Sequence, residues 1–153
     1  MAIYKYPEFK RASKKHLIAC ECLILSLKND ECKQKEKHIL TTIYYLTGYI
    51  FETILKFSLY ASVSFDKNED ISKLNSHGLT FDTDIKIHNL IKLKRAIEAK
   101  NITSLKEYEN NKNLFSTWSS EIRYDEKTKF SKEEILSFFE FSKATYTILQ
   151  QYK

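Results

Sequence analysis

The sequence predicts an all-α fold, an antiparallel four-helix bundle with one additional short helix. Three observations predict it: 153 residues contain only two glycines and one proline, apolar side chains recur at helical spacing, and Ser131-x-x-Glu134 is a capping box. Because folds with many strands need frequent turn residues, their scarcity favours a few long helices. The length fits one domain, residues 1–153, which can bury a substantial core.

Capping residues and apolar spacing mark where each helix should begin. Pro7 suits the first turn of one helix, Asp30 can cap the next, and a second capping box is Ser104-x-x-Glu107. The expected helices span about residues 7–29, 31–61, 84–100, 104–117 and 131–149. The third helix should turn Ile87 inward, the last should bury Ile148, and residues 64–83 should form a long polar loop.

The charge is basic, and lysine supplies most of it. The formal net charge is +5, and arginine occurs only at Arg11, Arg95 and Arg123. A nucleic-acid-binding patch and an ordinary solvated lysine surface both fit this composition. Arginine is the better phosphate clamp because its planar fork donates two parallel hydrogen bonds.

Cysteine and glycine usage narrows the function classes. Three cysteines suit a reducing compartment, and residues 1–15 lack the apolar core of a signal peptide, so we expect a cytoplasmic protein. No cysteine or histidine has zinc-finger spacing, so we expect no metal site and no cofactor. The two glycines lie 30 residues apart, which excludes a phosphate-binding P-loop.

Residues 39–65 carry only two charges, Glu52 and Lys56, and are long enough to span a bilayer. Each charge at the membrane centre costs about 2.5–3.5 kcal/mol on insertion scales. The polar residues also fall on one stripe of the helix. We therefore interpret this segment as an amphipathic helix and expect no membrane association.

A helical wheel at about 100° per residue separates two faces of this segment. The apolar face gathers Ile39, Ile43, Leu46, Ile50, Ile54 and Phe57. The polar stripe gathers His38, Tyr45, Tyr49, Glu52 and Lys56 within roughly one 60° sector. The stripe is either a solvated face with one ion pair or a groove that meets a partner or a phosphate. Gly48 lies inside this helix, where a close helix–helix contact would explain it.

Three short motifs in this order resemble HEPN domains. In the first, His38 precedes a Tyr-rich turn, then Gly48-Tyr49, Glu52 and Leu55-Lys56. The second is His88-Asn-Leu90, and the third is Trp118 followed by Arg123-Tyr124 ahead of the last helix. Together they cover residues 38 to about 149.

The resemblance implies a four-helix bundle that often dimerises and works in RNA handling, bacterial defence or toxin–antitoxin systems. Many relatives partner a small nucleotidyltransferase. Active relatives are metal-independent ribonucleases whose final helix carries Arg, four to six residues, then His. In the implied chemistry the ribose 2′-OH attacks the adjacent phosphate while His moves the proton and Arg stabilises the charge.

This chain departs from the ribonuclease motif, because no histidine follows Arg123. The one literal match, Arg11-Ala-Ser-Lys-Lys-His16, lies on the first helix, and we interpret both residues as surface residues. Whether the chain is an enzyme therefore stays open. The candidate catalytic residues are His38 and His88, with Arg123.

Three hypotheses remain. In the first, a HEPN-like homodimer binds RNA, a nucleotide or a protein partner in a defence or toxin–antitoxin module. In the second it is a metal-independent ribonuclease with a non-standard site, and in the third a structural assembly subunit whose tyrosine stripe is an interface. The candidate binding residues are Tyr45, Tyr49, Glu52, Lys56, Arg123 and Tyr124. We also expect His88, Lys92 and Arg95 to lie near one face of the third helix, as a phosphate-binding or an ordinary charged surface.

Overall fold

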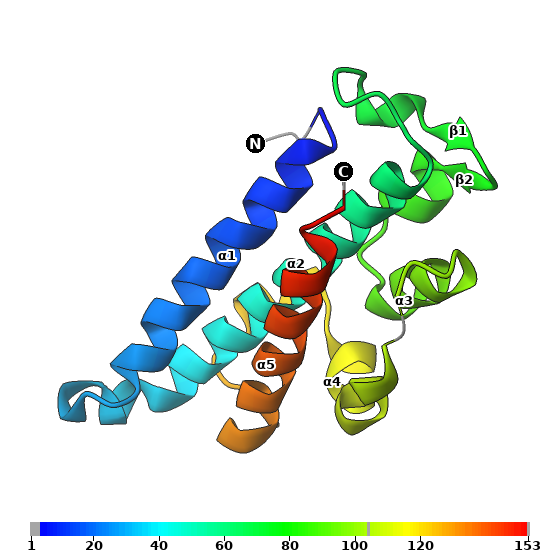
Figure 1. Cartoon of the computed structure of the whole chain (residues 1–153). Helices are drawn as coiled ribbons and strands as arrows, with labels where there is room; N and C mark the ends of the chain where they lie inside the picture. Colours follow the sequence, from blue (N-terminus) through cyan, green and yellow to red (C-terminus); the bar gives the residue numbers. More distant parts are fainter. Residues whose placement is uncertain (1–3, 104, 153) are drawn as a thin grey trace.

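A central helix, α2 (Glu36–Ser62), is contacted on several sides by the rest of the chain, in a computed structural model that describes residues 4–103 and 105–152 (Figure 1). Helix α1 (Pro7–Ser26) lies antiparallel beside it. Helices α3 (Leu90–Ala99) and α5 (Lys132–Leu149) pack on other sides. The chain is mostly helical, which confirms the predicted class.

Burial on α2 extends around the whole helix in its second half. Every residue from 50 to 61 is buried, including Glu52 and Lys56. The first half keeps the two-sided pattern of the wheel, with Ile43 buried and Thr42 exposed. The prediction that α2 turns a polar stripe away from the interior is therefore wrong at Glu52 and Lys56, because other elements of the chain cover that side.

The start of α1 at Pro7 agrees with prediction, whereas the start of α2 does not. Residues Asp30–Lys35 form a 3₁₀ helix, η1, and α2 begins only at Glu36. The side chain of Asn29, and not Asp30, caps η1 by accepting a hydrogen bond of 3.0 Å from the Glu31 backbone N–H. No residue of η1 is buried, so no packing favours the wider α-helical turn there.

Helix α3 begins six residues later than predicted. Phe81–Ile85 form a separate π-helical turn, η3, which Thr80 caps. The chain then runs on to Asn89, whose side chain accepts from the Lys92 backbone N–H at 3.0 Å and starts α3. Ile87, predicted to face inward on the helix, is half-exposed ahead of it.

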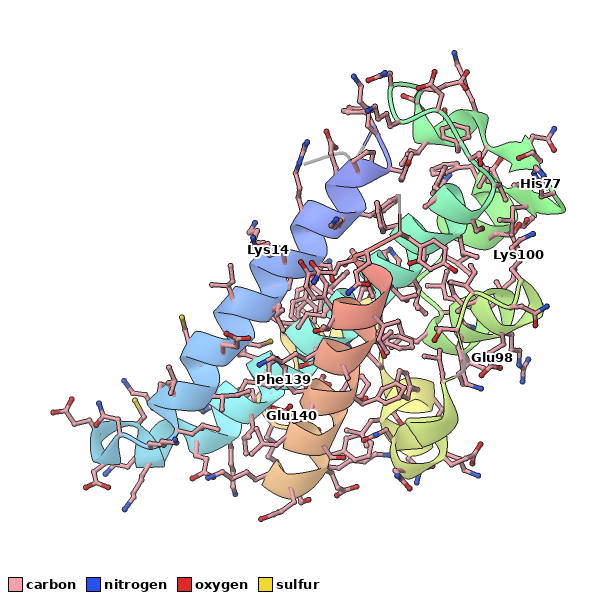
Figure 2. All side chains as sticks on the ribbon, in the orientation of Figure 1. Lys14, His77, Glu98, Lys100, Phe139 and Glu140 are labelled. Atoms are coloured by element: carbon pink, nitrogen blue, oxygen red, sulfur yellow. The ribbon has the colours of Figure 1, made fainter. Side chains whose placement is uncertain are left out.

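The predicted loop 64–83 contains regular structure. Ile71–Lys73 form a 3₁₀ turn, η2, and strands β1 (Asn75–Ser76) and β2 (Leu79–Thr80) form a two-stranded antiparallel hairpin. His77 and Gly78 have φ angles of 54° and 77°, the left-handed pair that a tight two-residue hairpin needs. Figure 2 shows Lys100 beside His77, and the Lys100 ammonium donates to the His77 carbonyl at 2.7 Å.

The stretch before α5 folds as three short elements where one short helix was expected. These are η4 (Lys106–Asn111), α4 (Lys112–Thr117) and η5 (Ser120–Tyr124). The predicted capping box at Ser104 lies outside the described residues. The box at Ser131 and Glu134 is confirmed, with reciprocal bonds of 3.1 and 3.0 Å. Ile148, predicted to be buried, is 55% exposed.

The residues that the structure describes include no helix with the length and apolarity needed to cross a membrane.

Gly48 lets a tryptophan reach the α2 backbone. A Cβ atom at position 48 would lie 1.9 Å from the Trp118 indole, which is far inside van der Waals contact. The indole N–H donates to the Tyr45 carbonyl at 3.1 Å. The close contact is thus made by a side chain that follows α4, and not by a second helix as predicted.

Gly48→Ala should lower the free energy of unfolding by about 1–3 kcal/mol through this overlap, although alanine alone favours a helix by up to about 1 kcal/mol. Urea denaturation measures the change, with Thr42→Ala, an exposed position of the same helix, as the control. In a Trp118→Ala background the substitution should cost nothing. An equal cost in both backgrounds would contradict the explanation.

Candidate functional site

Side chains from four separate parts of the chain meet beside the middle of α2. We call the set the α2 cluster, and it consists of His16, Tyr45, Tyr49, Glu52, Lys56, His88 and Arg123. The first residue comes from α1, the next four from α2, His88 from the segment before α3 and Arg123 from η5.

A buried ion pair forms the base of the α2 cluster. The Lys56 ammonium lies 2.6 Å from Oε1 of Glu52, and the two residues are only 4% and 2% exposed. Their i, i+4 spacing on α2 brings the two groups together. Buried charges of this kind are tolerated only when paired, because each one loses its hydration.

His88 connects the buried carboxylate with solvent. Its Nδ1 lies 3.1 Å from both carboxylate oxygens of Glu52, and its side chain is 51% exposed. An ionised carboxylate only accepts, so Nδ1 carries a hydrogen and donates. The other ring nitrogen, Nε2, is then free to accept or release a proton. His88 occupies this position because the chain between η3 and α3 is not helical, so the prediction that it shares a helix face with Lys92 and Arg95 is wrong.

Tyr49 is the centre of the aromatic contacts in the α2 cluster. Its ring centroid lies 5.0 Å from that of Trp118 and 5.1 Å from that of Tyr45, both edge-on. The rings of His16 and His88 lie at 5.7 and 6.3 Å. Burial first, then Tyr45 and Glu52, raise the pKa of Tyr49, while Arg123 lowers it slightly. The Tyr49 phenol therefore keeps its proton and acts as a hydrogen-bond donor at neutral pH.

Arg123 lies at the exposed edge of the α2 cluster. Its guanidinium carbon lies 4.7 Å from the centroid of the exposed Tyr124 ring, a cation–π contact. The neighbouring phenol of Tyr124, and then that of Tyr45, raise the pKa of Arg123. Arg123 thus stacks on an aromatic ring, while Glu52 is bonded to Lys56 and His88.

His16 belongs to the α2 cluster, although the sequence suggested a surface residue. It is half-buried on α1 against Tyr49. Burial and then Lys15 lower its pKa, and Glu52 opposes them, so the His16 imidazole is neutral at pH 7. Arg11, the other half of the literal motif, is exposed and lines a different hollow with Lys67. The missed signal was the apolar spacing of α1, because His16 lies seven residues after Phe9 and four before Cys20, both buried on the same side of the helix.

The other candidate residues lie elsewhere. His38 is exposed and lines a hollow with Gln34 and Thr42, about 21 Å along the α2 axis from Glu52 at about 1.5 Å per residue. Lys92 donates to the Thr83 carbonyl at 2.6 Å, and Arg95 is exposed on α3. Within residues 4–103 and 105–152, no three His, Cys, Asp or Glu side chains gather as metal ligands.

The α2 cluster presents a defined set of groups to a ligand. The His88 imidazole and the Arg123 guanidinium are exposed above a buried ion pair, Tyr45 is half-buried, and the exposed Tyr124 ring lies beside Arg123 at the edge of the cluster. Cationic and phenolic donors suit a phosphate or another oxyanion. An imidazole oriented by a carboxylate is the arrangement that general acid–base catalysis uses.

Removing one partner of the buried pair should destabilise the fold strongly. Glu52→Leu leaves the buried Lys56 ammonium unpaired and should cost about 3–5 kcal/mol of unfolding free energy, whereas Lys56→Met leaves Glu52 bonded to His88 and should cost less. The double variant removes both charges and should recover most of that loss. Lys73→Ala, which breaks the exposed pair with Glu69, should change the urea midpoint little. A double variant no more stable than the single ones would show that an unpaired buried charge is not the cause of their lower stability.

Comparison with known proteins gave no match to a family model, a curated protein or a solved structure. The resemblance to HEPN domains therefore rests on the sequence motifs alone. Its functional content is developed as a proposal below.

Proposed function

We propose that this chain is a HEPN-like four-helix domain that binds RNA or a nucleotide through the α2 cluster. One observation carries the proposal: motifs far apart in the sequence lie in contact. Glu52 of the first motif bonds His88 of the second at 3.1 Å. Tyr49 of the first packs against Trp118 of the third at 5.0 Å. If each motif served only the packing of its own helix, its polar side chains would not need to gather around the same charged residues.

The exposed groups of the α2 cluster suit a nucleotide. The Arg123 guanidinium offers a cationic donor for a phosphate. Tyr124 is exposed beside Arg123 and offers a ring face on which a base can stack, a contact that tolerates any sequence. This combination of a phosphate contact and an aromatic face favours a single-stranded ligand over a duplex.

The cellular setting forms part of the same proposal. We assign the chain to the cytoplasm, in a bacterial defence or toxin–antitoxin module with a nucleotidyltransferase as its protein partner. We also propose a homodimer. Ile18 and Leu25 on α1, with Cys22 between them, are exposed at i, i+4 and i+7 spacing and would provide an apolar face for a second copy.

Arg123→Ala should weaken binding of a labelled single-stranded oligouridine by about fivefold at about 0.1 M salt, the contribution of one phosphate contact. Fluorescence anisotropy measures the affinity. Arg95→Ala removes the same charge from an exposed position on α3. It should leave binding within twofold of the wild type. Equal losses in both variants, or no binding by the wild type, would overturn the proposed function.

A second candidate function is metal-independent cleavage of RNA, favoured by the His88–Glu52 pair. Nε2 of His88 would take the proton of a ribose 2′-OH while its oxygen attacks the adjacent phosphorus. The bond from phosphorus to the 5′-oxygen breaks, and that oxygen takes a proton from solvent. The products are a 2′,3′-cyclic phosphate and a 5′-hydroxyl. Glu52 would stabilise the imidazolium formed on His88, and Arg123 would stabilise the phosphorane charge.

Under this second function, His88→Gln should reduce cleavage by at least about 100-fold, the usual contribution of a general base, with RNA affinity little changed. Product analysis by gel in the presence of EDTA measures the rate and the end groups. His38→Gln, at an exposed imidazole outside the α2 cluster, serves as the control. Cleavage that survives His88→Gln would exclude this mechanism and leave the binding function intact.

A further inference from the structure

Lysines surround a second hollow, at the end of the molecule where α2 and α5 begin. The hollow has a volume of about 740 Å³. Lys33, Lys37, Lys127 and Lys132 line it, and Leu40 and Phe130 supply apolar surface. We call this hollow the lysine cleft. None of its four lysines belongs to the motifs described above.

The lysine cleft is strongly cationic. Its lining holds four lysines and one carboxylate, Glu36, a net charge of +3. Lys132 lies 3.6 Å from Glu36, and Lys33 lies 2.9 Å from the exposed Asp30. In the described part of the chain, the ammonium groups of Lys37 and Lys127 have no carboxylate within salt-bridge distance. Two cations in a concave surface are thus available for an external anion.

The lysine cleft continues toward the α2 cluster. A smaller adjoining hollow of about 280 Å³ shares Lys127, Thr128 and Phe130 with it. The same hollow reaches Ile122 of η5, the residue before Arg123, although none of its lining residues belongs to the α2 cluster and they include one carboxylate, Asp125. Along α2, the 12 residues from Lys37 to Tyr49 correspond to about 18 Å at about 1.5 Å per residue. The two positions also differ by about 120° around α2 at about 100° per residue, so a strand that joins them passes around the helix and needs at least about five stacked nucleotides at about 3.4 Å each.

We propose that the lysine cleft binds the phosphate backbone of a single RNA strand whose other end occupies the α2 cluster. The proposal rests on the proposed function and adds a second contact site and a ligand length. Lysine suits this role because its flexible ammonium follows a backbone as a point charge without reading bases. The continuity of the two hollows favours a strand over a free nucleotide, which would fill only one of them.

The experiment compares Lys37→Ala/Lys127→Ala with a matched control, Lys14→Ala/Lys67→Ala. Both pairs remove two exposed lysines. Lys14 projects from α1 (Figure 2), and Lys67 lies in the loop after α2. Binding is measured by anisotropy for a labelled oligouridine of about ten nucleotides and for labelled diuridine monophosphate over a range of salt concentrations. A longer strand can span both sites, and the dinucleotide only one.

The cleft variant should bind the long strand about 25-fold more weakly at about 0.1 M salt, with a salt slope smaller by about 1.4, as for two lost contacts. Its affinity for the dinucleotide should stay within twofold of the wild type, and the control variant should match the wild type on both probes. Equal weakening by the control, or an equal loss for the dinucleotide, would overturn the strand proposal. If the long strand binds with a normal Arg123 dependence and the cleft variant is unaffected, only this inference fails, because the proposed function depends on Arg123.

Discussion

The buried pair of Glu52 and Lys56 is the constraint on which the rest of the structure depends. Two opposite charges 2.6 Å apart, each nearly inaccessible, lie on the most buried helix of the chain. Each charge loses its hydration on folding, and the pair is tolerated because each group satisfies the other. His88 bonds Glu52 of this pair and is itself 51% exposed, so it connects the pair with solvent. An accessible imidazole is therefore hydrogen-bonded to a charge inside the core.

Covering that pair determines how the neighbouring elements pack. Helix α1 contacts α2 along its length, and α3 and η5 contact it elsewhere, so the second half of α2 is enclosed. Gly48 removes a side chain at the one place where the Trp118 indole must approach the helix. That approach fixes Tyr49 edge-on between Trp118 and the two imidazoles. The aromatic contacts and the ion pair thus hold one another in place.

Much of this arrangement could be predicted from the sequence where local chemistry decides it. Pro7 and the Ser131–Glu134 box mark helix starts by their own backbone geometry, and the wheel placed Tyr45, Tyr49, Glu52 and Lys56 together on α2. Long-range packing could not be predicted in this way. Nothing local says that η5 and the segment at His88 cover the polar stripe, or that His16 joins it from another helix. The hairpin at His77-Gly78 was a missed local signal, because a glycine readily adopts the positive φ that the second position of such a turn needs.

The placement of the two kinds of basic residue gives the lysine excess a physical interpretation that composition alone leaves open. Arg123, one of three arginines, is stacked on Tyr124 beside Tyr45, where its orientation is restricted and a ligand can be held in one geometry. The lysines of the cleft have long flexible stems and no aromatic partner that restricts them to one direction, except where they pair with Glu36 or Asp30. A uniform lysine surface would not concentrate a charge of +3 in one concave region next to such a site. In the proposed function, the fixed guanidinium positions one phosphate, and the mobile ammonium groups retain the strand that carries it.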